Sequence, residues 1–235
     1  MALFERFLQP SPRPTMADWP KRIWTKEEFP DEYKAYVLSW LQRDFSEYRF
    51  VFAPGRDACK TSYSYLFGYG EDELLYLMQE ESGIRLITLK KGDITTVKTS
   101  LELLNAKITI SYQSEDAEKQ IDFPYVPSTY YLYDPFLNWL LGLDKDFLPS
   151  VAETHHPRPQ KLYEESLVMF NFSLHAYRLG NGFDDYRYRY EMHRLKWAPW
   201  KKKLEEWLEV PMDRGLFRLY HFGYKTECEY ILNKK

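Results

Sequence analysis

Short apolar runs separated by turn residues fill residues 48–143, and they constrain the fold more than any other feature of the sequence. In the clearest run, 107–112, isoleucine and tyrosine at the even positions alternate with polar residues at the odd positions. A period of two places these two sets of side chains on opposite faces of a β-strand. Six further runs have the same short, β-rich character: 49–52, 62–67, 74–78, 84–89, 94–99 and 119–125. The segment is therefore predicted to form seven short strands.

One amphipathic helix is predicted to follow the seventh strand. After Pro127, apolar residues recur at helical rather than alternating spacing, and Gly142 follows the last of them. Glycine commonly ends a helix because it adopts the left-handed conformation without steric cost. The apolar stripe of this predicted helix consists of Tyr133, Phe136, Leu137, Leu140 and Leu141.

The order of seven strands and then one helix resembles the pleckstrin-homology-like barrel. Three patterns carry the resemblance: Ile94-x-x-Val97, Ile108-x-Ile110-x-Tyr112 and Tyr133-x-x-Phe136-x-x-x-Leu140. The resemblance covers residues 48–143 and implies two near-orthogonal antiparallel sheets, closed at one end by the helix. It also implies a peptide groove between an open sheet edge and that helix. Here the groove would be bordered by Ile94, Val97, Tyr133, Phe136 and Leu140.

The segment before the predicted barrel, residues 1–47, is interpreted as an extension that carries a helix. This helix is predicted to begin near Pro30, a favourable first-turn residue, and its apolar stripe is expected to pack on the barrel. After the barrel, residues 144–160 contain three prolines and few apolar residues, which is typical of a linker. The stripe of the N-terminal helix consists of Tyr33, Tyr36, Val37, Trp40 and Leu41.

Residues 161–235 are predicted to form a smaller ββαββ domain, which makes the whole chain α+β and mainly β. Alternating runs at 168–175 and 186–193 flank Gly180-Asn181-Gly182 and suggest a hairpin. A short helix is predicted from Pro199 to the residue before Pro211, followed by a strand pair at 216–222 and 224–232. A helix over 163–179 remains an alternative, because Leu167, Phe170, Leu174 and Tyr177 also have helical spacing.

Composition limits the classes of partner and location. The chain has 44% hydrophobic and 18% aromatic residues, which disfavours disorder, and a net charge of −3. This charge gives no general attraction to nucleic acid or to anionic membranes. No run approaches 18 consecutive apolar residues, and the first ten residues do not form a secretory signal, so no transmembrane segment and a cytoplasmic location are expected. Cys59 and Cys228 form no CxxC motif and are expected to be reduced.

The sequence contains no catalytic signature. Nucleophile-elbow, phosphate-loop and dinucleotide-binding patterns are absent, and the five histidines do not have the spacing of metal ligands. No catalytic residue, cofactor or metal is predicted. With many aromatic residues and no catalytic constellation, the chain is interpreted as a non-enzymatic binding or scaffold module that recognises a protein or peptide. Its oligomeric state is left open.

Two other hypotheses use charged residues outside the predicted groove. A small-ligand or catalytic pocket between the two domains could use carboxylates, arginines and a histidine that lie close in sequence. Alternatively, the interleaved tyrosines and arginines at 186–193 could bind nucleic acid, although the charge disfavours it. A loop between the first two strands could add an anion-binding pair. The residues for these roles are Asp184, Asp185, Arg187, Arg189 and His193 for the pocket and Arg56 and Lys60 for the loop.

Overall fold

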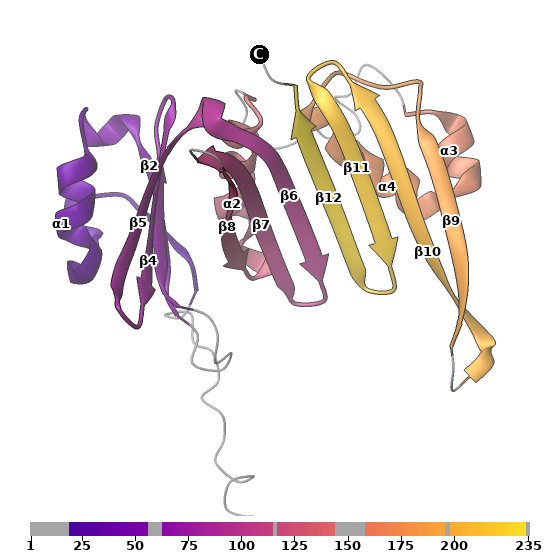
Figure 1. Cartoon of the computed structure of the whole chain (residues 1–235), viewed down its shortest axis with the longest axis horizontal. Coiled ribbons are helices and arrows are strands. Elements are labelled where there is room, and N and C mark those ends of the chain that lie inside the picture. The colour runs from indigo at the N-terminus through magenta and orange to yellow at the C-terminus, as the bar shows by residue number, and fades with distance from the viewer. Residues whose placement is uncertain (1–18, 56–62, 115–116, 144–157, 196–197, 234–235) are drawn as a thin grey trace, which may run out of the picture. The chain divides into compact units, whose positions relative to one another are not determined.

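The chain folds as two compact units, Met1–Lys91 and Gly92–Lys235, each with one antiparallel sheet. The computed structural model (Figure 1) describes residues 19–55, 63–114, 117–143, 158–195 and 198–233. The protein is mainly β, as the sequence predicts. In the described residues neither sheet closes on itself. No helix in this part of the chain has the length and apolar character needed to cross a bilayer.

The first unit contains a five-stranded sheet in the order β1-β2-β3-β4-β5. A helix, α1 (Asp31–Trp40), and two short 3-10 turns, η3 (Lys26–Glu28) and η4 (Phe45–Glu47), lie between the first two strands in sequence. The N-terminal helix predicted near Pro30 is therefore confirmed. The strands are β1 (Lys21–Ile23), β2 (Arg49–Ala53), β3 (Tyr65–Tyr69), β4 (Glu73–Glu80) and β5 (Gly83–Lys90).

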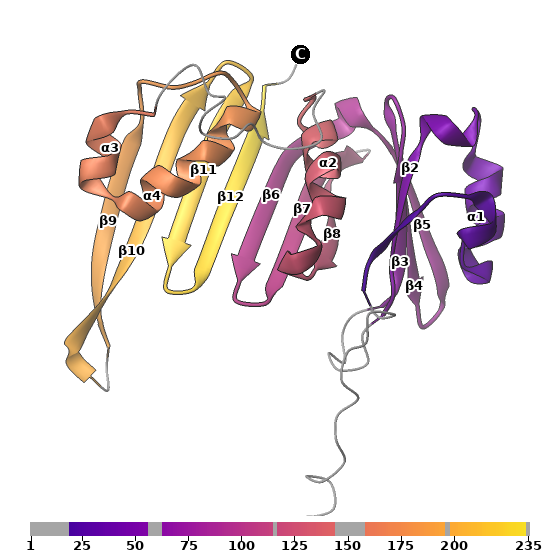
Figure 2. The same cartoon turned by 180° about the vertical axis from the view of Figure 1, so that it is seen from behind.

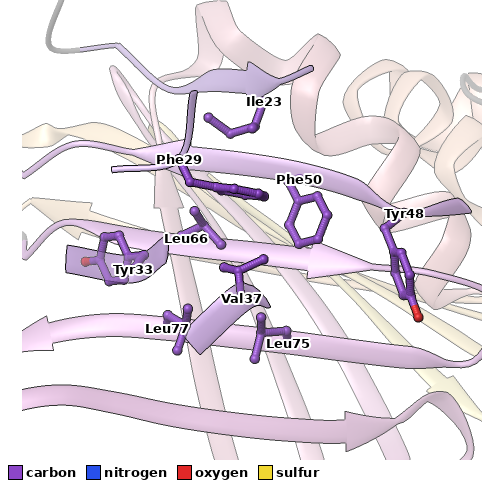
Figure 3. Packing of buried hydrophobic residues seen from close by; sticks show 9 residues of the cluster. All are labelled: Ile23, Phe29, Tyr33, Val37, Tyr48, Phe50, Leu66, Leu75 and Leu77. Carbon is purple, nitrogen blue, oxygen red and sulfur yellow. The ribbon is translucent and has the colours of Figure 1, made fainter. Parts of the chain in front are cut away.

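An aromatic core joins α1 to this sheet (Figure 3). Phe50 is fully buried, with the rings of Phe29 and Phe45 at centroid distances of 5.0 and 5.5 Å. Its ring lies over Gly68 of β3, where an added Cβ would approach the Phe50 ring to 2.2 Å. Tyr33 of α1 is also buried and donates a hydrogen bond to the Ser64 carbonyl at 2.8 Å. Glycine at position 68 thus makes room for the central ring of the core.

The second unit contains a seven-stranded sheet in the order β8-β7-β6-β12-β11-β10-β9. Its helices, with α2 over one half and α3 and α4 over the other, lie on one face, and the opposite face carries none of them (Figure 2). The strands are β6 (Ile94–Glu102), β7 (Asn105–Ser114), β8 (Ala117–Tyr125), β9 (Arg187–Leu195), β10 (Ala198–Met212), β11 (Gly215–Phe222) and β12 (Lys225–Leu232). The helical elements are η5 (Lys91–Asp93), which begins at the boundary between the units, η6 (Pro127–Thr129), α2 (Tyr130–Leu140), α3 (Gln160–Glu165), α4 (Leu167–Phe172) and η8 (Ser173–Arg178).

The seven strands and the helix predicted in residues 48–143 are all present, as β2 to β8 and α2. Gly142 has φ +71, which agrees with the predicted helix stop. The strands are divided between the two sheets, however. The boundary between the compact units falls between Lys91 and Gly92 in the sequence, rather than at residues 48 and 143. β6 pairs with β12, so strands from the two predicted domains form one continuous hydrogen-bonded sheet. Because of this long-range pairing, the sheet continues across the expected boundary between residues 48–143 and 161–235.

Two elements of the predicted ββαββ domain differ in the structure. Residues 163–179 are helical, as in the alternative, but they are divided among α3, α4 and η8. The chain is extended at Ser166, which caps α4 by accepting a hydrogen bond from the Met169 amide at 3.2 Å. The predicted 168–175 to 186–193 hairpin is therefore wrong. The predicted helix after Pro199 is also wrong, because these residues lie in β10 between β9 and β11. Backbone pairing on both sides favours the extended chain over a helical pattern of only a few apolar residues.

Candidate functional site at the hairpin end of the sheet

Two hairpin turns lie side by side at one end of the seven-stranded sheet (Figure 1). One connects β6 to β7 through Leu103 and Leu104, and the other connects β11 to β12 through Gly223 and Tyr224. The turns are neighbours because Glu102 of β6 pairs with Lys225 of β12. Three large apolar side chains extend from them: Leu103 is 64% exposed, Leu104 77% and Tyr224 74%. We call Leu103, Leu104 and Tyr224 the apolar tips.

The backbone of one tip is strained. The first residue of each two-residue turn has a positive φ, which is +64° at Gly223 and +53° at Leu103. Glycine adopts this conformation without steric cost, whereas a bulky residue there is an outlier that costs about 1–3 kcal/mol. Among the described residues, Leu103 is the one non-glycine residue with positive φ. The two neighbouring hairpins therefore have different residues at the same turn position. One has glycine there, and the other has a leucine whose backbone is strained.

A second exposed apolar group lies at the same end of the sheet, on β9 and β10. Met192 of β9 pairs with Leu204 of β10. Tyr190, two residues before Met192, lies on the same face of β9. Tyr190 is 56% exposed and Met192 58%. Figure 2 shows that the far ends of β9 and β10 extend beyond α3 and α4. Tyr190 and Met192 lie on the helix-bearing face and are nevertheless more than half exposed.

Charged residues on the helix-free face are arranged in cross-strand pairs. Arg218 lies 3.0 Å from Glu209 and 3.4 Å from Glu229, between β10 and β12. Lys98 lies 2.9 Å from Glu227 across the β6–β12 join. These carboxylates are the paired counter-charges of Arg218 and Lys98. A polyanion would have to compete with them, which disfavours the nucleic-acid hypothesis for this surface.

The predicted strand with tyrosines on one face and arginines on the other is confirmed as β9. Its Arg189 guanidinium lies 4.8 Å from the Trp207 ring centroid, and the Trp207 ring lies 5.8 Å from that of Tyr220. Tyr220 donates a hydrogen bond to Glu205 at 2.8 Å, and burial together with this carboxylate raises its pKa to about 12. Arg189 thus borders a half-buried aromatic group on the helix-free face.

One cluster on this face has the chemistry of a metal site. Nε2 of His193 lies 2.5 Å from a Glu205 oxygen and 3.9 Å from a Glu191 oxygen. One ligand atom from each of these three residues lies within 4.8 Å of the others. Imidazole nitrogen and carboxylate oxygens together suit divalent transition metals, so these residues could hold one.

Beneath the helices, the unit buries a polar network. Arg178 is 1% exposed and donates hydrogen bonds to Asn138 at 2.6 Å and to Asp134 at 3.1 Å. Burial raises the pKa of Asp134, and Arg178 opposes that rise. Nearby, burial and then the Arg178 charge lower the pKa of His175 to about 3. These groups join α2 to η8 and have a structural role.

A buried carboxylate ties the helices to β10. Glu206 accepts hydrogen bonds from Ser166 at 2.5 Å and from Tyr188 at 2.9 Å. Burial and the Glu206 carboxylate raise the pKa of Tyr188. Because Ser166 is also the cap of α4, one carboxylate connects the helix start, β10 and β9.

The residues of the predicted peptide groove are not exposed. All five are buried, and the Phe136 ring packs 5.0 Å from that of Phe123. Ile94 and Val97 belong to β6, and Tyr133, Phe136 and Leu140 belong to α2. In this structure these five side chains are therefore part of the buried layer between the helix and the sheet.

The residues of the predicted pocket are only partly brought together. Arg187, Arg189 and His193 share the helix-free face of β9, whereas Asp184 and Asp185 are exposed in the segment before it. The two predicted domains join edge to edge through β6 and β12, so a continuous sheet lies where the pocket between them was expected. The predicted anion-binding residues Arg56 and Lys60 lie outside the described residues.

Sequence reasoning missed the apolar tips and the buried Arg178. The tips had one local signal, since the two-residue turn between two alternating runs is Leu103-Leu104, where glycine or asparagine is usual. Their proximity to Tyr224 depends on the β6–β12 pairing and has no local signal. The residues around Arg178 in the sequence likewise do not indicate that this arginine is buried.

Comparisons with known proteins add no relative for this chain. A scan against protein-family models and searches of curated proteins and of solved structures each found no match.

Proposed function

We propose that the chain is a non-enzymatic binding module that recognises a protein partner through the apolar tips. The observation that carries this proposal is Leu103, which is strained and largely exposed while the equivalent position of the next hairpin is glycine. In the isolated protein, the leucine side chain costs stability and contributes little packing. Strained residues concentrate at functional sites, and exposed apolar groups mark interaction surfaces. Contact with a partner would bury the Leu103 side chain, and this burial would offset the cost of its strained backbone.

The surroundings of the tips indicate what the partner offers. Nζ of Lys203 lies 3.7 Å from the position of a Cβ added at Gly223, so a cation lies beside the turn that carries Tyr224. Lys202 and Lys203 are both exposed. A complementary surface has an apolar pocket for the leucines and tyrosine, flanked by acidic side chains that pair with these lysines.

The resemblance to the pleckstrin-homology-like class also belongs to this proposal. Four strands, β2 to β5, lie in one sheet, three strands, β6 to β8, lie in another, and α2 follows them. This order supports a relationship to that class, in which protein recognition is common. Because the residues that would border the implied groove are buried, we place the binding surface at the apolar tips instead.

The test begins with the intact chain as bait in an extract of its host, followed by purification of the captured protein. Titration of that protein then gives a Kd for the wild type and for Leu103→Ser/Leu104→Ser. We expect the double variant to bind about tenfold or more weakly, because residues at the centre of an interface dominate its affinity. Leu167→Ser is the matched control, since Leu167 is exposed in the same unit but lies on α4.

A second variant separates binding from folding. Leu103→Gly relieves the positive φ, so we expect the free energy of unfolding to rise by about 1 kcal/mol while partner affinity falls. Unchanged affinity in both tip variants would overturn the proposal, as would failure to obtain a saturable partner. Binding of the wild type to phosphatidylserine vesicles, lost in Leu103→Ser/Leu104→Ser, would instead assign the tips to a membrane surface.

A further inference from the structure

Strand β9 is an edge strand with features that suit another strand. It lies last in the order of the seven-stranded sheet, and within the described residues β10 is its one paired neighbour. An exposed edge presents backbone N–H and C=O groups to any extended segment, and proteins usually block long edges. β9 has nine residues, and Tyr190 and Met192 in its middle are more than half exposed.

We propose that β9 of a second copy of this chain pairs with β9 in antiparallel orientation, about a two-fold axis at Tyr190 perpendicular to the sheet. Such an axis keeps the helix-free faces of both copies on the same side. Residues directly opposite each other in an antiparallel pair share a face, so odd positions of β9 meet odd positions and even positions meet even ones. The inference goes beyond the proposed function, because the apolar tips lie on other strands.

Charge selects this register. With the axis at Tyr190, Arg189 lies opposite Glu191 of the second copy, and Glu191 lies opposite Arg189 of the second copy. Moving the axis to Arg189 would place two arginines directly opposite, and moving it to Glu191 would place two glutamates opposite. Opposite charges across a strand pair are stabilising and like charges are destabilising. Arg187 meets His193 in the favoured register.

The glutamate also gains a partner that its own chain does not place opposite it. Within the sheet, Glu191 is paired directly with Glu205 of β10, which has the same charge. His193 lies closer to Glu205 than to Glu191, at 2.5 and 3.9 Å. Arg189 from a second copy would therefore place a cation on the free side of Glu191.

The other face of the pair would be apolar. Tyr190 would meet Tyr190 of the second copy, and Tyr188 would meet Met192. The Tyr188 and Tyr190 rings already stack within one chain, at a centroid distance of 5.9 Å. Pairing would extend this stack into one apolar strip that runs across the two-fold axis and covers side chains exposed in the single chain.

The test is a charge-reversal cycle on the intact chain, with sedimentation equilibrium as the measure of association. We expect the wild type to form dimers, and Arg189→Glu and Glu191→Arg to dimerise about tenfold or more weakly, because each reversal opposes like charges at both symmetric positions. The double variant should dimerise like the wild type. A mixture of the two single variants should form heterodimers, because every charge again meets its opposite.

Lys119→Glu provides the matched control, since Lys119 is exposed on β8, the strand at the other edge of the sheet. It should leave dimerisation unchanged. A monomeric wild type would overturn the inference, and so would a dimer that is insensitive to both reversals or a mixture that forms no heterodimer. Binding at the apolar tips is measured separately, so a monomeric wild type that still loses its partner in Leu103→Ser/Leu104→Ser would leave the proposed function standing.

Discussion

The two sheets bury different kinds of side chain beneath their helices. In the five-stranded sheet, the helix-facing core around Phe50 is built from aromatic and aliphatic residues, together with Gly68. In the seven-stranded sheet, the corresponding layer also encloses the charged Arg178 and the carboxylate of Glu206. Apolar packing is non-directional, whereas buried charges require particular partners. The stability of the second unit therefore depends on the placement of its elements, as well as on the amount of apolar surface that it buries.

The largest expected effect contrasts a core aromatic residue with an exposed one. Phe50→Ala should lower the free energy of unfolding by about 3–5 kcal/mol, because it removes a buried ring at the centre of its cluster. Tyr224→Ala should change it by less than about 0.5 kcal/mol, because its ring is exposed. Denaturant titration of both variants measures the contrast. Equal losses would mean that Tyr224 packs within the fold.

A smaller effect distinguishes the buried ion pair from a surface one. Asp134→Asn should destabilise the protein by about 3 kcal/mol, because it leaves the buried Arg178 charge without its counter-ion. Asp122→Asn is the control, since Asp122 pairs with Lys107 at 3.0 Å on the exposed face. It should cost less than about 1 kcal/mol. Should the two losses be similar, the buried network would have no special role in the second unit.

The smallest effect, taken over a single pH unit, concerns the protonation of His175. Burial lowers the pKa of His175 to about 3 in the folded protein, from an ordinary value near 6.5. Below pH 6.5 the unfolded chain binds a proton at this site and the folded chain does not, so stability falls as the pH drops from 6.5 toward 3. The slope should reach about 1.4 kcal/mol per pH unit. His175→Phe should flatten the stability profile in this window, and an unchanged profile would contradict the assignment.

The sequence was sufficient to predict those strands and helices that local residue patterns determine. Short β-rich runs bounded by turn residues located β2 to β8, and helical spacing located α1 and α2. It was insufficient for β10, because Trp200, Leu204, Trp207 and Leu208 fit a helix as well, and the pairing with β9 and β11 decides the outcome. Which strands share a sheet depends on contacts between distant residues, and no local pattern encodes the pairing of β6 with β12.

The candidate site was less predictable than the fold for the same reason. Leu103 and Leu104 are visible in the sequence, but their functional interest comes from a backbone angle and from Tyr224 on a neighbouring hairpin. The residues of the predicted groove were correctly assigned as apolar, yet apolar character does not distinguish a core from a binding surface. The Tyr/Arg alternation did locate β9, the strand on which the dimer inference rests.

The position of β12 bears on how the protein is made. β12 is the middle strand of its sheet, with three strands on each side, and it is also the last of the seven along the chain. Since β12 is the partner of both β6 and β11, these two strands can complete the sheet only after residues 225–232 have been synthesised. Unpaired edges on a waiting chain invite association with other chains, and long-range pairing is slow. Until β12 pairs with both strands, the nascent protein is therefore expected to be prone to association with other chains.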